Sequence, residues 1–286
     1  MQLNIPKEVL VVAEALKGAG FKAYLVGGCV RDILLKREPK DWDVTTDALP
    51  EDIQHIFPES VYENNFGTVG IKTGSEDQKL AIVEVTTFRK EGKYEDFRHP
   101  LEIKFAKHVE DDLSRRDITL NAMAQDIDEP KNIVDPYDGQ ADLKAKLIRA
   151  VGKPEERFRE DALRLMRAVR FAAELGFQIE PKTTEAIKIT ADLLEKIAQE
   201  RIRDEFVKII MAPGNGAAWG VVMLEQLGLL KNIVPELREG IAVGQNKHHI
   251  YTVWEHNLRA LDYSANKGYS FEVRLASLLH DVGKPK

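Results

Sequence analysis

Hydrophobic and polar positions follow two different patterns along the chain. Up to about Asp142, short apolar runs rich in β-branched residues alternate with short amphipathic segments, which predicts strands and helices assembled on one sheet. Helices are expected over residues 1–19, ended by Gly20, and over Val30–Leu35. The predicted strands are Ala23–Gly27, Trp42–Thr46, Thr68–Lys72 and Leu80–Phe88.

After about Asp142 the apolar positions recur three and four residues apart, so no further strand is expected. The expected fold class is therefore α+β, with a mixed head over residues 1–145, an all-helical neck and body over 146–245, and the start of another helical domain over 246–286. Because the sequence stops directly after a charged motif, we expect this last domain to be incomplete. The predicted helices are Glu155–Leu175, Thr183–Ala198, Glu200–Met211 and Ala217–Leu229, followed by helices from Tyr251 to Leu279.

Composition and charge narrow the class of protein. Of the 286 residues, 43% are hydrophobic and 31% charged, as in ordinary globular proteins. The single cysteine, Cys29, excludes a disulfide framework and a cysteine-based metal cluster. No apolar run approaches the roughly 18 residues of a membrane span, and no leader is recognisable, which predicts a cytoplasmic protein with no membrane partner. The net charge of −6 excludes a uniformly basic nucleic-acid-binding surface but not a local basic groove.

Two carboxylates separated by one residue, Asp41 and Asp43, are the first candidates for chemistry. Residues i and i+2 of a strand share a face, so the two carboxylates are expected side by side. Carboxylate oxygens are ligands of Mg²⁺, which can stabilise the attacking and leaving oxygens of a phosphoryl displacement. A solvated Asp-x-Asp pair at a strand edge is the alternative.

A glycine pair, Gly27-Gly28, stands 14 residues before Asp41, between a predicted strand and a predicted helix. Glycine lets the backbone approach a phosphate, and the helix that follows offers free N–H groups and the positive charge of Arg31. The order of strand, Gly-Gly, helix and strand therefore predicts a triphosphate cradle beside the carboxylates. A tight turn that needs small residues is the alternative.

The whole segment Leu25–Thr46, LVGGCVRDILLKREPKDWDVTT, resembles the signature of the class II tRNA nucleotidyltransferase and poly(A) polymerase family. This resemblance implies that the mixed head is a palm-like nucleotidyltransferase domain.

A second segment, LSRRDITLNAMA over residues 113–124, is similar to the RRDFTxNA segment of this family, with Ile118 in place of the usual Phe. The resemblance implies that Arg116 contacts the nucleotide and that Asp117 and Asn121 support its sugar and phosphate contacts. Taken without the family, Arg115 and Arg116 are a salt-bridging pair on a helix.

The first long helix of the second pattern has an apolar half and a half that carries Arg164, Arg167 and Arg170. A solvated face with an Asp161–Arg164 pair is the alternative. Its segment EDALR resembles the EDxxR motif of the family, which implies that Asp161 and Arg164 hydrogen-bond the Watson–Crick edge of the incoming base. A carboxylate accepts from the amino group that cytosine and adenine share, so the pair can select C and A. Arg167 and Arg170 then face the triphosphate or the RNA.

Two further segments match the family. A polar loop follows the last predicted strand of the head; by resemblance it is a flexible loop that reorients selection from C to A, with Arg89, Tyr94 and Arg98 at matching positions. A mobile surface hairpin is the alternative. Glu84, just before this loop, is a candidate third metal carboxylate. Glu200–Phe206 resembles a later helical motif and is interpreted as mainly structural.

The C-terminal region contains His256 and then His280-Asp281, which resemble the start of an HD domain, whose His and Asp side chains bind a divalent metal. The final aspartate of that pattern is absent from the sequence. We therefore expect neither a competent metal site nor phosphohydrolase activity here.

Together the motifs predict a tRNA nucleotidyltransferase that adds C and A to the tRNA 3′ end from CTP and ATP, with Mg²⁺ as cofactor. A CC-adding or A-adding enzyme and a bacterial poly(A) polymerase are the alternatives within the family. Poly(A) polymerases of this family tend to carry Leu-Tyr after the NA or NS pair, whereas Asn121-Ala-Met-Ala stands here. An HD phosphohydrolase and a non-catalytic RNA-binding module are alternatives of other classes; the Asp-x-Asp pair argues against the second.

Overall fold

The computed structural model describes residues 5–62, 67–92, 94, 102–245 and 250–285. The chain divides into two compact units, one of residues 1–93 with 100–145 and one of residues 94–99 with 146–286. The first unit combines strands and helices and the second is mostly helical, so the predicted α+β class is confirmed.

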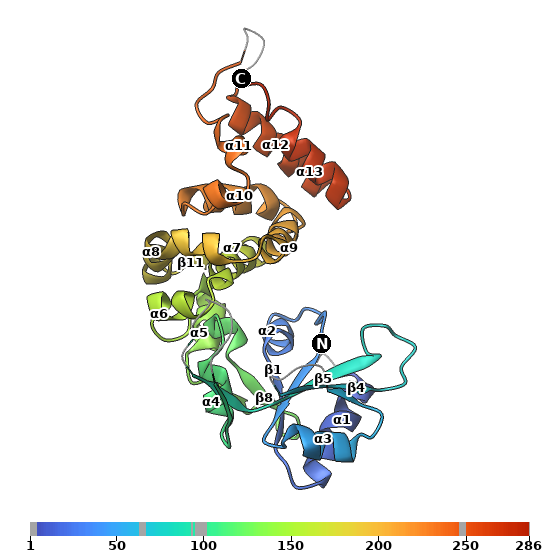
Figure 1. Cartoon of the computed structure of the whole chain (residues 1–286). Helices are drawn as coiled ribbons and strands as arrows, with labels where there is room; N and C mark the ends of the chain where they lie inside the picture. The colour runs from blue at the N-terminus through green and yellow to red at the C-terminus, as the bar shows by residue number, and fades with distance from the viewer. Residues whose placement is uncertain (1–4, 63–66, 93, 95–101, 246–249, 286) are drawn as a thin grey trace. The chain divides into compact units, whose positions relative to one another are not determined.

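The first unit is built on a mixed sheet, which among the described residues has seven strands in the order β3-β4-β5-β2-β1-β8-β9 (Figure 1). β1 pairs antiparallel with β2 and β8, β2 pairs parallel with β5, and β5 pairs antiparallel with β4. The four strands predicted from the sequence are β1, β2, β4 and β5. The bounds of the sheet strands are β1 Ala23–Val26, β2 Asp43–Thr46, β3 Val61–Tyr62, β4 Thr68–Lys72, β5 Ile82–Thr87, β8 Ala124–Asp126 and β9 Ile133–Val134; β6 Arg89–Glu91 and β7 Ile103–Phe105 form a separate antiparallel pair.

One face of this sheet is apolar and the other polar. Helices α1 (Lys7–Gly18) and α3 (Pro50–Ile56) cover the apolar face (Figure 1), where Val44 and Val85 of adjacent strands are fully buried. Because side chains alternate along a strand, the neighbours of these valines project from the opposite face, which carries the candidate chemistry. The remaining helices of this unit are α2 Gly28–Leu34, α4 Val109–Ser114 and α5 Gly139–Ala145, with a 3₁₀ turn at Thr119–Asn121.

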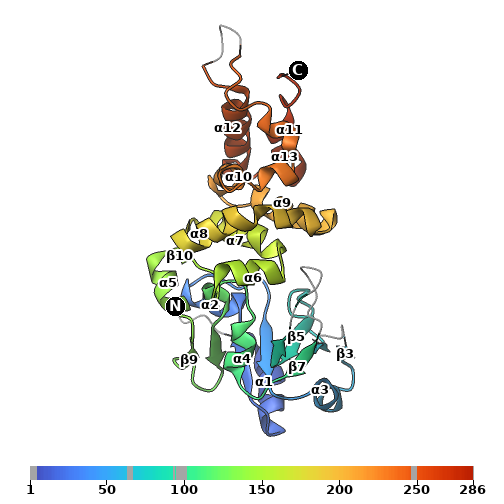
Figure 2. The ribbon, with the colours of Figure 1, turned by 60° about the vertical axis from the view of Figure 1, so that its left-hand side comes forward.

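The second unit is a stack of helices in which α7 packs against α9 and α10, and α12 lies beside α13 (Figure 2). Its apolar stripes are those that the periodicity indicated, for example Leu165, Met166 and Val169 on α7, all fully buried. The helices are α6 Pro154–Glu160, α7 Leu163–Leu175, α8 Pro181–Thr190, α9 Gln199–Ile210, α10 Gly216–Gln226, α11 Pro235–Arg238, α12 Val253–Asn266 and α13 Phe271–Leu279, with 3₁₀ segments at Ala191–Lys196 and Leu230–Asn232.

The structure corrects three predictions for this region. Strands do not end near Asp142, because β10 (Leu147–Ile148) and β11 (Gln178–Ile179) form a short parallel pair. The predicted helix Thr183–Ala198 changes to a 3₁₀ segment at Ala191. The predicted helix Glu155–Leu175 is two helices, α6 and α7, interrupted at residue 161.

The interruption has a local cause in Asp161. Its backbone is extended (φ −137°, ψ 106°), and its carboxylate accepts the N–H of Leu163 at 3.0 Å. An aspartate side chain that satisfies a free backbone N–H favours a helix start over a helix interior. A helical wheel that treats Asp161 as part of α7 therefore assigns its side chain a wrong position relative to the arginines of that helix.

A buried arginine joins the last helices to the rest of the second unit. Arg274 on α13 is 5% exposed, and its guanidinium donates to the carbonyls of Ile210 and Ala212, both at 3.1 Å, and of Ala265 at 3.3 Å. These carbonyls lie at or just after the C-terminal ends of α9 and α12, where the helix dipole favours a positive charge.

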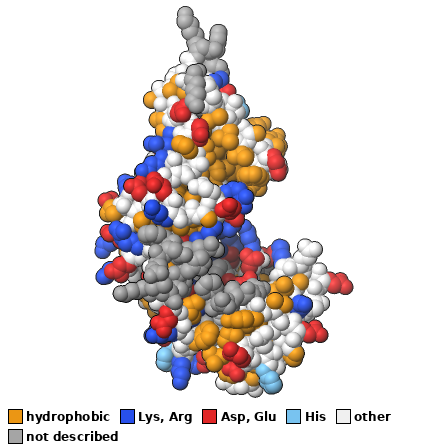
Figure 3. Space-filling model, in the orientation of Figure 1, with side chains coloured by type: hydrophobic (Ala, Val, Ile, Leu, Met, Phe, Trp, Pro, Cys, Tyr) orange, Lys and Arg blue, Asp and Glu red, His pale blue; other side chains and the backbone are white. Residues whose placement is uncertain are grey.

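The surface over α12 and α13 shows a patch of hydrophobic side chains (Figure 3). Tyr263, Tyr269 and Val273 are among the exposed large hydrophobic residues of these helices and their connection. Within the described part of the chain, no helix has the length and apolar character needed to cross a membrane.

Candidate functional site

Asp43 and Glu84 lie side by side on the polar face of the sheet, because β2 and β5 are parallel and the two residues are direct partners in the register. Asp43 is half-buried and Glu84 is exposed. β2 begins only at Asp43, and Asp41 lies in an exposed bend just before it. The prediction that one strand carries both aspartates is therefore wrong, although the Asp41 carboxylate still acts on the pKa of Asp43.

The electrostatics at Asp43 favour a cation. Burial raises the pKa of Asp43, the nearby Arg116 guanidinium lowers it, and the Asp41 carboxylate raises it further, so that the pKa ends above its ordinary value. A divalent cation would relieve both the desolvation and the repulsion between the two carboxylates.

Gly27 brings this carboxylate and Arg116 together. Its φ is +81°, and a Cβ placed there would lie 2.8 Å from Nη1 of Arg116 and 3.6 Å from Oδ2 of Asp43. A residue with a side chain would have to displace the guanidinium and would also be strained by the backbone conformation. Glycine at this position is thus required for the close approach of backbone, carboxylate and guanidinium.

Arg116 is held from its other side by an acidic residue of α4. Its Nη2 lies 3.2 Å from Oδ2 of Asp112, which also binds Arg115 at 2.8 Å. Burial alone would raise the pKa of Asp112, but the two guanidinium groups outweigh burial and hold it below its ordinary value. The Nε of Arg116 is buried and has no hydrogen-bond partner in the described structure. The salt-bridging alternative for the Arg-Arg pair is therefore real, yet it leaves Arg116 facing Gly27 and Asp43.

The predicted residues Arg31, Asn121 and Asp117 form one hydrogen-bonded chain. Nη1 of Arg31 donates to Oδ1 of Asn121 at 2.9 Å, and the Asn121 amide donates to Asp117 at 3.3 Å. All three are buried, and the Nη2 of Arg31 lies 3.7 Å from the Cβ position of Gly28. The chain thus connects the segment after the glycine pair to the segment after Arg116.

In the second unit, the two proposed base-reading residues each have an ion-pair partner. Asp161 accepts from Arg201 of α9 at 3.1 and 3.4 Å. Arg164 donates to Glu160 at 2.6 Å, and Glu160 also accepts from Arg157 at 2.6 Å. Arg201 was missed by the sequence analysis, which interpreted its segment as structural; it lies 40 residues from Asp161, and no spacing rule connects the two.

The remaining arginines of α7 flank an aromatic ring. The guanidinium carbons of Arg170 and Arg167 lie 4.1 and 5.4 Å from the ring centroid of Phe171. Arg170 also lies 2.6 Å from Glu205 of α9. Both arginines are half-buried, in contrast to the fully buried apolar half of the helix.

Of the predicted flexible-loop residues, Arg89 lies in β6 and forms an ion pair with Glu91 at 2.9 Å. Tyr94 is half-buried, and Arg98 lies outside the described residues.

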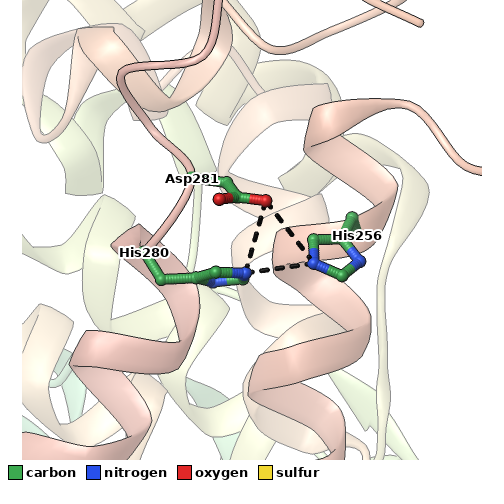
Figure 4. Close-up of side chains that lie close together, drawn as sticks. All are labelled: His256, His280 and Asp281. Carbon is green, nitrogen blue, oxygen red and sulfur yellow. Dashed lines mark hydrogen bonds and ion pairs between the residues drawn. The ribbon is translucent and has the colours of Figure 1, made fainter. Parts of the chain in front are cut away.

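The three predicted residues of the C-terminal region converge (Figure 4). The Nε2 atoms of His256 on α12 and His280 after α13 are 3.0 Å apart, and each lies within 3.5 Å of Oδ2 of Asp281. Among the described residues, this is the one group of three or more His, Cys, Asp or Glu residues with ligand atoms all within 4.8 Å of one another. The Nδ1 of His280 lies 2.8 Å from the carbonyl of Ser277. A proton on Nδ1 would make this a hydrogen bond and leave the lone pair of Nε2 toward the group, as in metal-ligating histidines.

A mixed sheet with adjacent carboxylates beside a glycine turn defines the class of the first unit as a nucleotidyltransferase head. Residues 23–149 match the family described as the poly A polymerase head domain, and residues 176–241 match the probable RNA and SrmB-binding site of polymerase A. The chain therefore belongs to the tRNA nucleotidyltransferase and poly(A) polymerase family. The group formed by His256, His280 and Asp281 lies beyond both matched ranges.

Known relatives carry the name CCA-adding enzyme. The chain is 46% identical to that of Lactobacillus helveticus over 221 residues, which are 77% of this chain and 54% of the relative, and 47% identical to that of Streptococcus suis over 213 residues, 73% and 51%. The chain thus spans about half the length of the curated relatives it matches.

Solved structures agree with the fold. The Bacillus stearothermophilus CCA-adding enzyme in complex with CTP superposes with a TM-score of 0.79 and 38% identity, over 97% of this chain and 62% of that one. The Thermotoga maritima CCA-adding enzyme complexed with tRNA gives a TM-score of 0.71 over 97% of this chain and 64% of that one. At 22% identity it supports the fold alone.

Proposed function

We propose that this protein adds C and A residues to the 3′ end of tRNA, using CTP and ATP and releasing pyrophosphate. The observation that carries the proposal is the convergence of Asp43, Gly27 and Arg116 on the polar face of the head, with Glu84 in register beside Asp43. The relatives named CCA-adding enzymes support the choice of reaction. The cytoplasm is the location that this function implies.

The chemistry assigned to the head is attack by the terminal ribose hydroxyl of the tRNA on the α-phosphorus of the nucleotide. Arg116 places a guanidinium beside the turn at Gly27, where it can bind the phosphates. The backbone at the glycine pair can approach them closely because no side chain intervenes. The buried chain of Arg31, Asn121 and Asp117 holds these segments in place.

Mg²⁺ fits the donor set of the head. Asp41, Asp43 and Glu84 offer hard carboxylate oxygens, and Asp43 stands where burial and Asp41 both oppose its negative charge. When bound there, Mg²⁺ would neutralise charge on the transferring phosphate. We assign Asp41 and Asp43 as its ligands, with Glu84 as a third.

Base selection is assigned to Asp161 and Arg164, with Arg167 and Arg170 toward the triphosphate or the RNA. A carboxylate and a guanidinium together match the edges of cytosine and adenine. In the structure the two side chains are engaged by Arg201 and Glu160, so reading a base requires these contacts to loosen or to be shared. The loop that contains Arg89, Tyr94 and Arg98 is assigned to the change from C to A selection.

The test is incorporation of single labelled nucleotides into three tRNA transcripts, which lack all of CCA, lack the final A, or are complete. The proposal requires CTP addition to the first, ATP addition to the second and no addition to the third. CTP addition to the first transcript without ATP addition to the second indicates a CC-adding enzyme. ATP addition to the second transcript without CTP addition to the first indicates an A-adding enzyme, and long A tails on any RNA indicate a poly(A) polymerase. If no nucleotide is incorporated into any transcript, the proposal and all of these alternative nucleotidyltransferase activities are contradicted.

A second proposal concerns the C-terminal region and departs from the expectation from the sequence. We propose that His256, His280 and Asp281 bind a divalent transition metal, because their ligand atoms already converge and the orientation of His280 suits ligation. Three protein ligands suffice where water completes the coordination. No hydrolytic activity is assigned to this group.

A further inference from the structure

One oxygen atom of Asp281 is shared by three nitrogen atoms. Oδ2 lies 2.6 Å from Nζ of Lys284, 3.4 Å from Nε2 of His280 and 3.5 Å from Nε2 of His256. Lys284 reaches this oxygen because a turn after α13, closed by a 3.0 Å hydrogen bond from its N–H to the carbonyl of Asp281, brings it back over the aspartate. The closest cation to the carboxylate is therefore an ammonium group supplied by the chain.

This ammonium is fixed by a second acceptor. Nζ of Lys284 also donates to Oε1 of Gln245 at 2.9 Å, and the Gln245 amide in turn donates to the carbonyl of Tyr251 at 3.3 Å. The lysine thus ties the carboxylate of the group to the segment that precedes α12. Its side chain is 45% exposed, so it can move into solvent without opening the core.

We propose that, in the metal-free protein, the Lys284 ammonium occupies the position beside Asp281 that a divalent metal would take. The ammonium must leave Asp281 when the metal binds. The inference rests on the metal site proposed above and adds its regulation. An oxygen that ligates a metal at about 2.0–2.2 Å cannot keep an ammonium at ion-pair distance without strong repulsion between the two cations. Lys284 is therefore a competitor that weakens metal binding.

The experiment is calorimetric titration of the whole chain with Zn²⁺. Excess Mg²⁺ is present to occupy the metal site proposed for the carboxylates of the head. The variant His256→Ala lacks one proposed ligand, so any Zn²⁺ that it still binds measures binding elsewhere on the surface. Lys284→Met removes the ammonium but keeps the length of the side chain, and we expect about tenfold tighter Zn²⁺ binding. Lys284→Arg keeps the charge and should bind like the unchanged protein.

The chain offers a matched control in Lys231→Met. Lys231 pairs with Asp192 at 2.7 Å and its side chain is 42% exposed, so the lysine matches Lys284 in ion-pair distance and exposure. Its partner Asp192 is more exposed than Asp281 and does not belong to the histidine group. Removing it should leave Zn²⁺ affinity unchanged.

The outcomes separate the two proposals. Binding that depends on His256 and tightens only in Lys284→Met supports the competition. Binding that depends on His256 but is equal or weaker in Lys284→Met overturns the competition and leaves the metal site standing. If Zn²⁺ binds no better to the unchanged protein and to Lys284→Met than to His256→Ala, the metal site itself is refuted, and the competition with it.

Discussion

The head and the second unit arrange their candidate residues in different ways. In the head, strand register sets Asp43 beside Glu84, and a glycine with positive φ brings the backbone within reach of Asp43 and Arg116. In the second unit, Asp161 lies at a break between two helices and is held by an ion pair to Arg201, which comes from another helix. A sheet register is difficult to change, whereas an exposed or half-exposed ion pair exchanges partners readily. Under the proposed function, we infer that the residues of the head carry out the transfer of the nucleotide and that those of the second unit select the base.

The largest effect is expected from removing a carboxylate of the head. Asp43→Ala should lower nucleotide incorporation by about a thousandfold or more, because the proposed metal loses its ligand beside Glu84. Single-turnover incorporation of CTP measures the loss. Circular dichroism and tRNA binding are the controls and should be close to those of the unchanged protein; near-normal turnover would remove Asp43 from the metal site.

A methyl group at the glycine turn should have the next largest effect. Gly27→Ala is expected to reduce incorporation by about a hundredfold, because the added Cβ must displace Arg116 from a distance of 2.8 Å. Gly74→Ala is a matched control, since Gly74 also has a positive φ (+73°) but nothing lies within 4 Å of its Cβ position. Equal losses in both variants would mean that backbone strain, and not the contact with Arg116, is responsible.

In the second unit, we expect a change of selectivity more than of rate. Arg201→Met frees Asp161 from its partner, and the preference for CTP over UTP should shift by about tenfold while the rate with CTP changes less. Arg203→Met serves as the control, because Arg203 is exposed and pairs with the adjacent Asp204 at 2.8 Å. A selectivity ratio that is the same in both variants would deny Arg201 a role in positioning Asp161.

The smallest effect concerns stability and not activity. Asp112 has a pKa held below its ordinary value in the folded head, so its contribution to the free energy of unfolding is present at neutral pH and is lost as the pH falls below about 4, toward the lowered pKa. Asp112→Asn should therefore lower the stability at pH 7 by about 2–3 kcal/mol and flatten its acid dependence. Urea unfolding at several pH values provides the measurement; parallel pH profiles for the two proteins would contradict the assignment.

Much of the head could be predicted from the sequence because its signals are local. Short apolar or alternating runs rich in β formers predicted the strands β1, β2, β4 and β5, and the pair Gly27-Gly28 indicated the turn at which the structure ends β1 and begins α2. The register of Glu84 against Asp43 could not be derived, since it depends on parallel pairing between strands far apart in the chain. The same holds for Arg116, whose approach to Gly27 is a tertiary contact.

In the second unit, helical periodicity identified the apolar stripes but not the ends of the helices. A uniform wheel runs straight through Asp161, because the interruption arises from one side-chain hydrogen bond to Leu163 that periodicity does not encode. Arg201 and Lys284 were missed for a similar reason. The role proposed for each rests on an ion pair whose partner, Asp161 or Asp281, is brought near only by the fold.

The central claim is that the head carries out nucleotide transfer and the second unit selects the base. Its most direct test is one pair of measurements on Gly27→Ala and Arg201→Met: the rate of CTP incorporation and the ratio of CTP to UTP incorporation on the same tRNA transcript. The account predicts that Gly27→Ala lowers the rate and leaves the ratio unchanged, and that Arg201→Met changes the ratio more than the rate. A Gly27→Ala variant that alters the ratio as strongly as the rate, or an Arg201→Met variant that loses rate at an unchanged ratio, would contradict it.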